Sequence, residues 1–119
     1  MLKLLEIILL ECGRKKRLIT YGSLAVELNR RIGRRVVPER GRGLGRRISK
    51  LLHPLCDRYY REFRVLPGSV VVLSKTGMPA EGYFKYLESR DIFKKEGKDR
   101  RAFWERKVSE FFEFCHKRW

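Results

Sequence analysis

Residues that hold metal ions or disulfide frameworks are scarce in this sequence. Its 119 residues include three cysteines and two histidines. The cysteines, Cys12, Cys56 and Cys115, lie far apart, and no pair has the CxxC spacing of a zinc site. His53 and Cys56 can share one side of a helix, but two histidines are too few for an ordinary ligand set. We therefore expect reduced, buried thiols, no metal and no other cofactor.

Long hydrophobic runs are missing as well. The most apolar stretch, LLEIILL at residues 4–10, is too short to span a bilayer and contains Glu6. It also lacks the small-residue cleavage site of a signal peptide. These absences favour a cytoplasmic protein.

Acidic residues are few beside basic ones, 14 against 29, which gives a net charge of +15. A small domain with this charge repels itself unless a polyanion screens it, so nucleic acid is the expected partner. An anionic membrane surface and a merely solvated charge are the alternatives. Residues 1–75 contain 18 of the basic side chains and 6 of the acidic ones, so the binding surface is expected there. Asp57, Glu62 and Glu81 are scattered and form no nuclease-like cluster, so we expect no enzyme.

The hydrophobic pattern predicts one α+β domain that covers residues 1–119. The expected elements are helices at 2–12, within 18–32, from about 40 to 53 and at about 99–117, and strands at 69–74 and 80–87. The valine-rich SVVVLS and the turn residues after it predict that the two strands form a hairpin. The polar stretch 94–101 is expected to be exposed.

The helix within residues 18–32 has a clear start and a clear inner side. Thr20 or Ser23 can cap its first turn. Its inward stripe consists of Leu24, Ala25, Leu28 and Ile32. The following GRRVVPER, residues 33–40, predicts a turn or a short extended link.

The next helix combines an apolar side with a cationic side. At 100° per residue, its apolar side consists of Leu44, Ile48, Leu51, Leu52 and Leu55. Its cationic side consists of Arg42, Arg46, Ser49 and His53, with Lys50 at the edge. Pro54 either kinks this helix or opens a second one.

The glycines beside these cations raise the question of a nucleotide-binding loop. Gly41, Gly43 and Gly45 do not have the GxGxxG spacing, and Pro38 interrupts the strand that would have to precede it. The sequence GxxxxGK[ST] of a P-loop is also missing. Glycines at a helix start instead let the backbone approach a phosphate. The stretch therefore favours the phosphates of a nucleic acid.

The order of elements predicts a winged helix-turn-helix that binds double-stranded DNA. The helix from about Arg40 to His53 is expected to enter the major groove, and the hairpin around Lys75 to touch the adjacent backbone or the minor groove. The stretches Arg14–Arg17 and Arg30–Arg35 are expected to hold phosphates. The predicted DNA-contacting residues are Arg30, Arg31, Arg34, Arg35, Arg40, Arg42, Arg46, Arg47, Ser49, Lys50 and Lys75.

Three short motifs resemble a known DNA-binding family. TYGSLA (20–25), RGLG (42–45) and, more loosely, PGSVVV (67–72) are similar to TYGxLA, RAVG and PCHRVV in the winged-helix domain of O6-alkylguanine-DNA alkyltransferases and alkyltransferase-like proteins. The resemblance covers about residues 18–84. It implies that Arg42 enters the base stack when a nucleotide is flipped and that Tyr21 lies near the DNA backbone. Gly68 stands where the family has its reactive cysteine, so we expect no alkyl transfer.

These observations support one main hypothesis and two alternatives. We expect a non-enzymatic double-stranded DNA-binding protein, transcriptional or chromatin-associated, in the nucleoid of a microbial cytoplasm. Small uncharacterised winged-helix proteins of microbes, which the end of this stretch also resembles, supply a fold and no activity. The alternatives are a lesion sensor without transferase activity and an RNA-binding module. The apolar residues 2–10 can belong either to the core or to a homodimer interface.

Overall fold

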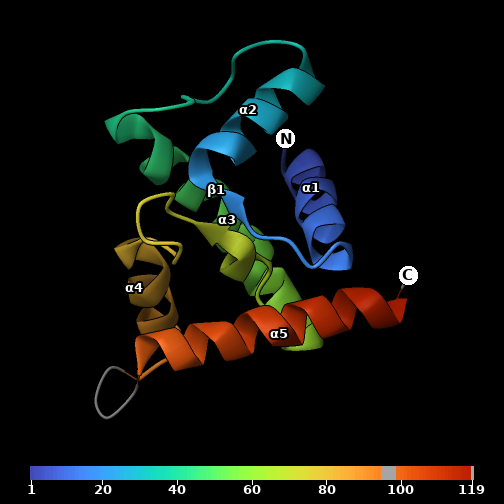
Figure 1. Ribbon diagram of the computed structural model, residues 1–119, viewed down its shortest axis with the longest axis vertical. Coiled ribbons are helices and arrows are strands. Elements are labelled where there is room, and N and C mark those ends of the chain that lie inside the picture. Colours follow the sequence, from blue (N-terminus) through green and yellow to red (C-terminus); the bar gives the residue numbers. More distant parts are fainter. Residues whose placement is uncertain (95–98, 119) are drawn as a thin grey trace.

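The computed structural model describes residues 1–94 and 99–118, so residues 95–98 of the polar stretch expected to be exposed lie outside it (Figure 1). Its elements are α1 (Leu2–Arg14), β1 (Ile19–Thr20), α2 (Tyr21–Ile32), α3 (Arg42–Phe63), the 3-10 helix η1 (Pro67–Val70), β2 (Val71–Val72), α4 (Glu81–Ser89) and α5 (Arg100–Arg118). The chain is therefore helix-rich with one small sheet, a coarse α+β arrangement. The helices expected near the two ends of the chain are confirmed.

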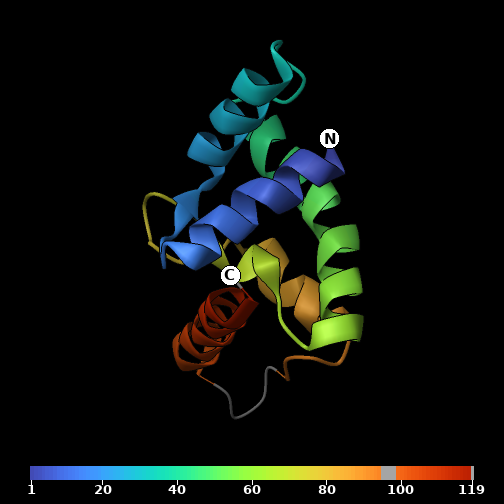
Figure 2. The same cartoon turned by 90° about the vertical axis from the view of Figure 1, so that its right-hand side faces the viewer.

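The core gathers the inner sides of α1, α2, α3 and α5 around η1 and β2. Leu5, Ile8 and Leu9 of α1 are buried in it, whereas Leu2 and Ile7 are exposed. Most of the apolar stretch 2–10 therefore belongs to the core. In Figures 1 and 2, α5 crosses one end of the molecule, and α2 with the loop after it forms the other end.

The local signals at the start and the inner side of α2 are confirmed. The Oγ1 atom of Thr20 accepts a hydrogen bond from the backbone N–H of Ser23 at 3.1 Å, as an N-cap residue does. Leu24, Ala25 and Leu28 of the predicted stripe are fully buried, and Ile32 is half-buried. The helix ends at Gly33, whose φ of 90° lies in the left-handed region that glycine adopts without strain.

The second possibility at Pro54, a new helix, is wrong, because α3 runs as one helix of 22 residues with Pro54 inside it. Proline has no N–H to donate to the carbonyl of Lys50, four residues earlier. Both residues are exposed, so water can satisfy that carbonyl and the helix continues. The opposite side of α3, with Ile48, Leu52 and Leu55, is buried.

The predicted β-hairpin is wrong. Of the stretch 69–74 only Val71 and Val72 form a strand, and they pair in parallel with Ile19 and Thr20. Residues 81–87 of the expected return strand belong to α4, which continues to Ser89. Tyr83, Phe84 and Leu87 have helical spacing and are buried beside aromatic residues of α5, which favours a helix there over a second strand.

The C-terminal helix α5 agrees with its predicted range to within one residue at each end. Its inward stripe of Trp104, Val108, Phe111 and Cys115 is buried, and the indole N–H of Trp104 donates to the carbonyl of Ser69 at 2.7 Å. That hydrogen bond joins α5 to η1.

Candidate nucleic-acid interface

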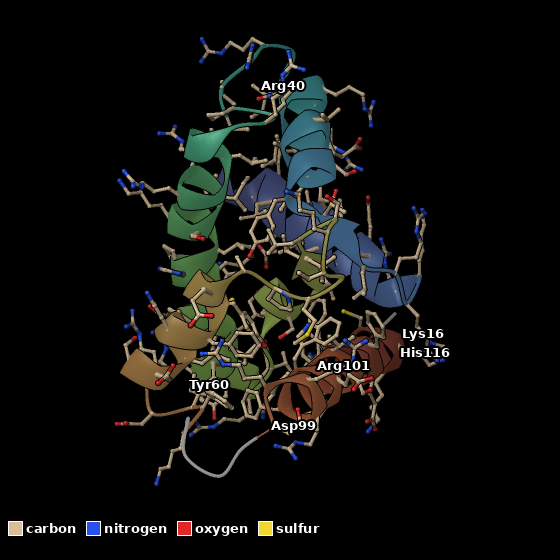
Figure 3. All side chains as sticks on the ribbon, turned by 60° about the vertical axis from the view of Figure 1, so that its left-hand side comes forward. Lys16, Arg40, Tyr60, Asp99, Arg101 and His116 are labelled. Atoms are coloured by element: carbon tan, nitrogen blue, oxygen red, sulfur yellow. The ribbon has the colours of Figure 1, made fainter. Side chains whose placement is uncertain are left out.

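Exposed cations gather on the loop 33–41 and the first half of α3. We call this group the α3 surface, and it consists of Arg34, Arg35, Arg40, Arg46, Arg47 and Lys50. Within residues 1–94 and 99–118, none of these six side chains forms an ion pair or a hydrogen bond. Figure 3 shows Arg40 at the tip of this end of the molecule. The α3 surface therefore keeps its positive charge uncompensated.

A buried asparagine holds the loop of this surface in place. The Oδ1 atom of Asn29 accepts hydrogen bonds from the N–H groups of Val36 at 2.8 Å and Val37 at 3.0 Å. Its Nδ2 atom donates to the carbonyl of Val37 at 2.9 Å and to Glu39 at 2.8 Å. All four hydrogen-bonding positions of this amide are thus used. The sequence analysis did not identify Asn29. Its position beside the inward Leu28 was the signal that a buried amide holds the neighbouring loop.

A hollow of about 300 Å³, open to solvent, lies between the loop and α3. Its lining consists of Val36, Pro38, Gly43, Arg46, Arg47 and Lys50. A Cβ atom at Gly43 would lie 3.4 Å from the Cγ atom of Pro38, so the missing side chain keeps the hollow open. Three cations around one concave surface suit a phosphate, because each adds an attractive field at the same point.

The exposed side of α3 is turned relative to the prediction. Ser49 and His53 are half-buried against α4, and the ring of His53 stacks on Tyr86 with centroids 4.5 Å apart. Burial lowers the pKa of His53, and the nearby charge of Arg90 lowers it further. Expecting Ser49 and His53 on the open cationic side was wrong, because α4 covers that side of α3.

The cations of α2 are neutralised. Arg30 pairs with Glu27 at 2.5 Å, and Arg31 pairs with Glu27 at 2.8 Å and with Glu11 at 2.7 Å. Hydrogen bonds from Arg30, and then from Arg31, lower the pKa of Glu27 to about 2. Arg31 consequently joins α2 to α1, and neither arginine belongs to the α3 surface.

The other predicted residues lie apart from this surface. Lys75 is exposed on the loop 73–79, which is closed by a hydrogen bond from the N–H of Leu73 to the carbonyl of Met78 at 2.8 Å. In Figures 1 and 2 this loop lies away from the loop 33–41 along the long axis. Tyr21 is buried, and its hydroxyl accepts a hydrogen bond from the N–H of Ala80 at 3.4 Å. Arg42 begins α3, but its side chain lies outside the described part of the structure.

Two motifs of the family resemblance, TYGSLA with Tyr21 and PGSVVV with Gly68, meet around a small cavity of about 20 Å³, enough for roughly one water molecule, whereas the described residues of RGLG contribute nothing to its lining. Tyr21, Ser49, Cys56, Gly68 and Tyr83 are among its lining residues. The Sγ atom of Cys56 accepts a hydrogen bond from the N–H of Gly68 at 3.4 Å and lies 3.0 Å from where a Cβ at Gly68 would be. Burial raises the pKa of Cys56 to about 12, so this sulfur stays a thiol at neutral pH.

Comparison with known proteins gives no match. No family model, no curated protein and no solved structure matches this chain. The interface is therefore argued from its own geometry.

Two further findings concern only the residues that the structure describes. No helix there is long and apolar enough to cross a membrane. No group of three or more histidine, cysteine, aspartate or glutamate side chains there could hold a metal ion.

Proposed function

We propose that this protein binds double-stranded DNA without changing it chemically, with the first half of α3 in the major groove. The observation that carries the proposal is the hollow where Arg46, Arg47 and Lys50 meet without acidic partners among the described residues. Unpaired cations on a concave surface attract a polyanion, and releasing the counterions of DNA drives binding.

Helix α3 suits the role of a groove reader. The major groove of B-form DNA is about 12 Å wide and admits an α-helix. The exposed side of α3 carries the three cations of the hollow, while Ile48 and Leu52 on the other side anchor it in the core. In this proposal α2 and α3 form a helix-turn-helix within a winged-helix-like domain, and the loop 73–79 with Lys75 takes the place of the wing.

A projecting helix favours duplex DNA over duplex RNA. The major groove of A-form RNA is deep and narrow, so an α-helix and its side chains do not reach the bases. The RNA-binding alternative therefore has less support than DNA binding. We propose that this binding serves transcription or chromatin, both of which use non-catalytic binding of DNA.

The lesion-sensor alternative also has less support. A flipped base needs a pocket that encloses it. The cavity beside Gly68 has room for about one water molecule, and Cys56 occupies the space next to it. That alternative depends on Arg42 and on an opening of this cavity.

Salt dependence tests the proposal directly. We expect the logarithm of the binding constant for a fluorescent 20-base-pair duplex to fall with the logarithm of salt concentration. If the six cations of the α3 surface each meet a phosphate, the slope is about −5. Unlabelled DNA should compete better than duplex RNA of equal length. A nearly flat slope, or stronger competition by RNA, would contradict the proposal.

A further inference from the structure

A second group of exposed cations lies where α1 ends. We call it the α1 corner, and it consists of Lys15, Lys16 and Arg17. Within the described ranges, none of the three forms an ion pair or a side-chain hydrogen bond. The nearest acid along the chain, Glu11, is already bound to Arg31 at 2.7 Å. The three cations of the corner are thus exposed and without an ion pair, as are the six cations of the α3 surface.

The backbone of the α1 corner is fixed by two hydrogen bonds. The N–H of Lys16 donates to the carbonyl of Gly13 at 3.2 Å, and that of Arg17 donates to the carbonyl of Cys12 at 2.9 Å. Together these bonds form the Schellman motif that ends many helices. The residue in its left-handed position is Lys16, with a φ of 53°. Glycine adopts this conformation without strain, so the chain keeps a lysine there at a cost to the fold.

The corner also packs firmly against the end of α5. A Cβ atom at Gly13 would lie only 2.3 Å from the Sγ atom of Cys115, so α1 and α5 touch closely at this point. Figure 3 accordingly shows Lys16 next to His116, the residue after Cys115. Beyond it, Lys117 pairs with Glu113 at 3.0 Å and Arg118 lies over the ring of Phe63. Among the described residues at this end, the α1 corner therefore supplies the exposed cations that make neither an ion pair nor a ring contact.

The α1 corner and α3 lie on opposite sides of the molecule. In Figure 3, Lys16 is at one edge and α3 at the other. The dimensions of the protein are 43 × 34 × 23 Å, and even the smallest exceeds two Debye lengths of about 8 Å at physiological salt. A duplex bound on one side of the molecule therefore barely weakens the attraction of the cations on the opposite side for a second duplex. For the same reason, two duplexes bound on opposite sides repel each other only weakly.

We propose that the α1 corner binds a second DNA duplex, so that one protein molecule bridges two duplexes. This inference rests on the proposed DNA binding by α3. A single short duplex cannot reach both surfaces, because DNA has a persistence length of about 150 base pairs and stays straight over 20. The corner would bind phosphates of DNA of any sequence, since it offers exposed cations and no helix that fits a groove.

A capture experiment tests bridging. A biotinylated 20-base-pair duplex is fixed on beads, the protein is added, and retention of a second, fluorescent 20-base-pair duplex is measured at about 100 mM salt. We expect capture that depends on protein and disappears at high salt. Binding of one duplex in solution without capture of a second would overturn the bridging proposal and leave the α3 proposal intact. Failure to bind even one duplex would overturn both.

A matched pair of variants assigns the effect to the corner. In the first, Lys15→Ala, Lys16→Gly and Arg17→Ala are combined; in the second, Arg61→Ala, Lys85→Ala and Lys94→Ala remove three exposed cations elsewhere that form no ion pair within the described residues. We expect the corner variant to bind one duplex within about three-fold of the wild type and to lose capture at least ten-fold. The second variant should retain capture. Equal capture by the corner variant and the wild type, as a dimer bridging through two α3 surfaces would give, would overturn the proposal.

The single change Lys16→Gly separates binding from folding. Because glycine fits the left-handed position without strain, the melting temperature should stay the same or rise. Capture should nevertheless weaken, since one of the three charges is gone. Unchanged capture together with a raised melting temperature would show that Lys16 takes no part in bridging and would count against the proposal.

Discussion

Two arginine pairs in this protein look alike in the sequence and differ in the structure. Arg30–Arg31 near the end of α2 lies against acids, with Arg31 between Glu11 and Glu27. Arg46–Arg47 in α3 lines an open hollow and has no acidic partner in the described residues. The first pair joins two helices, whereas the second is free to meet a ligand.

The residues one turn earlier explain this difference. Glu27 precedes Arg30 by three positions and Arg31 by four, the spacings at which side chains meet on a helix. The position with the same spacing, three before Arg46 and four before Arg47, is Gly43, and its neighbours Arg42 and Leu44 are not acidic either. A run of cations therefore indicates a binding surface only after the acids one turn away have been considered.

Removing the cations of the hollow should have the largest effect. We expect the combined change Arg46→Ala, Arg47→Ala and Lys50→Ala to weaken duplex binding about 100-fold, because each cation contributes about 1 kcal/mol. The slope of the logarithm of the binding constant against the logarithm of salt concentration should become shallower, from about −5 to about −2.5. Fluorescence anisotropy over a range of salt concentrations measures both quantities.

The matched control is Arg30→Ala in the paired arginine. The side chain of Arg30 is 66% exposed, so we expect the fold to tolerate its removal. Its charge is already neutralised by Glu27, so DNA should lose little attraction. Binding should change less than two-fold. If Arg30→Ala and the triple variant weakened binding alike per charge, the distinction between the two pairs would be wrong.

The next largest effect on DNA binding should come from placing an acid in α3 at the position that corresponds to Glu27 of α2. Gly43→Glu places a carboxylate three and four residues before Arg46 and Arg47, the spacing of Glu27. We expect about ten-fold weaker binding of duplex DNA. Folding should not suffer, since an acid in the first turn stabilises a helix by about 0.3–1 kcal/mol and a Cβ at this position lies at ordinary contact distance, 3.4 Å from Pro38.

The neutral variant Gly43→Gln separates charge from size. It fills the same space in the hollow without the carboxylate, so binding should stay within about three-fold of the wild type. Equal losses for Gly43→Glu and Gly43→Gln in the same anisotropy assay would mean that the shape of the hollow matters and the pairing of its arginines does not.

The helices were predictable because their signals are local. The cap at Thr20 and the inward stripe of α2 follow from spacing within one helix. Residues 80–87 were wrongly expected to form a strand, because Tyr83, Phe84 and Tyr86 favour strands locally, while their burial beside α5 favours a helix. Such contacts join residues about 20 positions apart, and a short window does not contain them.

The same error shifted the prediction for the binding surface. With α4 expected as a strand, nothing in the sequence indicated that Ser49 and His53 would be covered. Arg46 and Lys50 are exposed as expected, because the opposite side of α3 is apolar by spacing alone, and Arg47, which lies outside the predicted cationic side, is exposed as well. The hollow itself could not be predicted, since it depends on the loop that Asn29 ties down.

The ion pairs of Arg30 and Arg31, one of which links α2 to α1, should stabilise the fold less at low pH. This is the smallest effect that we expect. The pKa of Glu27 is lowered to about 2 by Arg30 and Arg31, and that of Glu11 is lowered by Arg31. A carboxylate with a lowered pKa stabilises the fold above its unfolded value of about 4.5, and this stabilisation is lost as the pH falls toward 2.

Urea denaturation at pH 7, 4.5, 3 and 2, followed by circular dichroism, measures the free energy of unfolding. It should fall less steeply in Glu27→Gln than in the wild type, whereas Glu62→Gln, an exposed acid without an ion pair in the described residues, should leave the profile unchanged. Identical profiles for the wild type and Glu27→Gln would mean that the α2 arginines are not tied up by Glu27, and the contrast with Arg46–Arg47 would disappear.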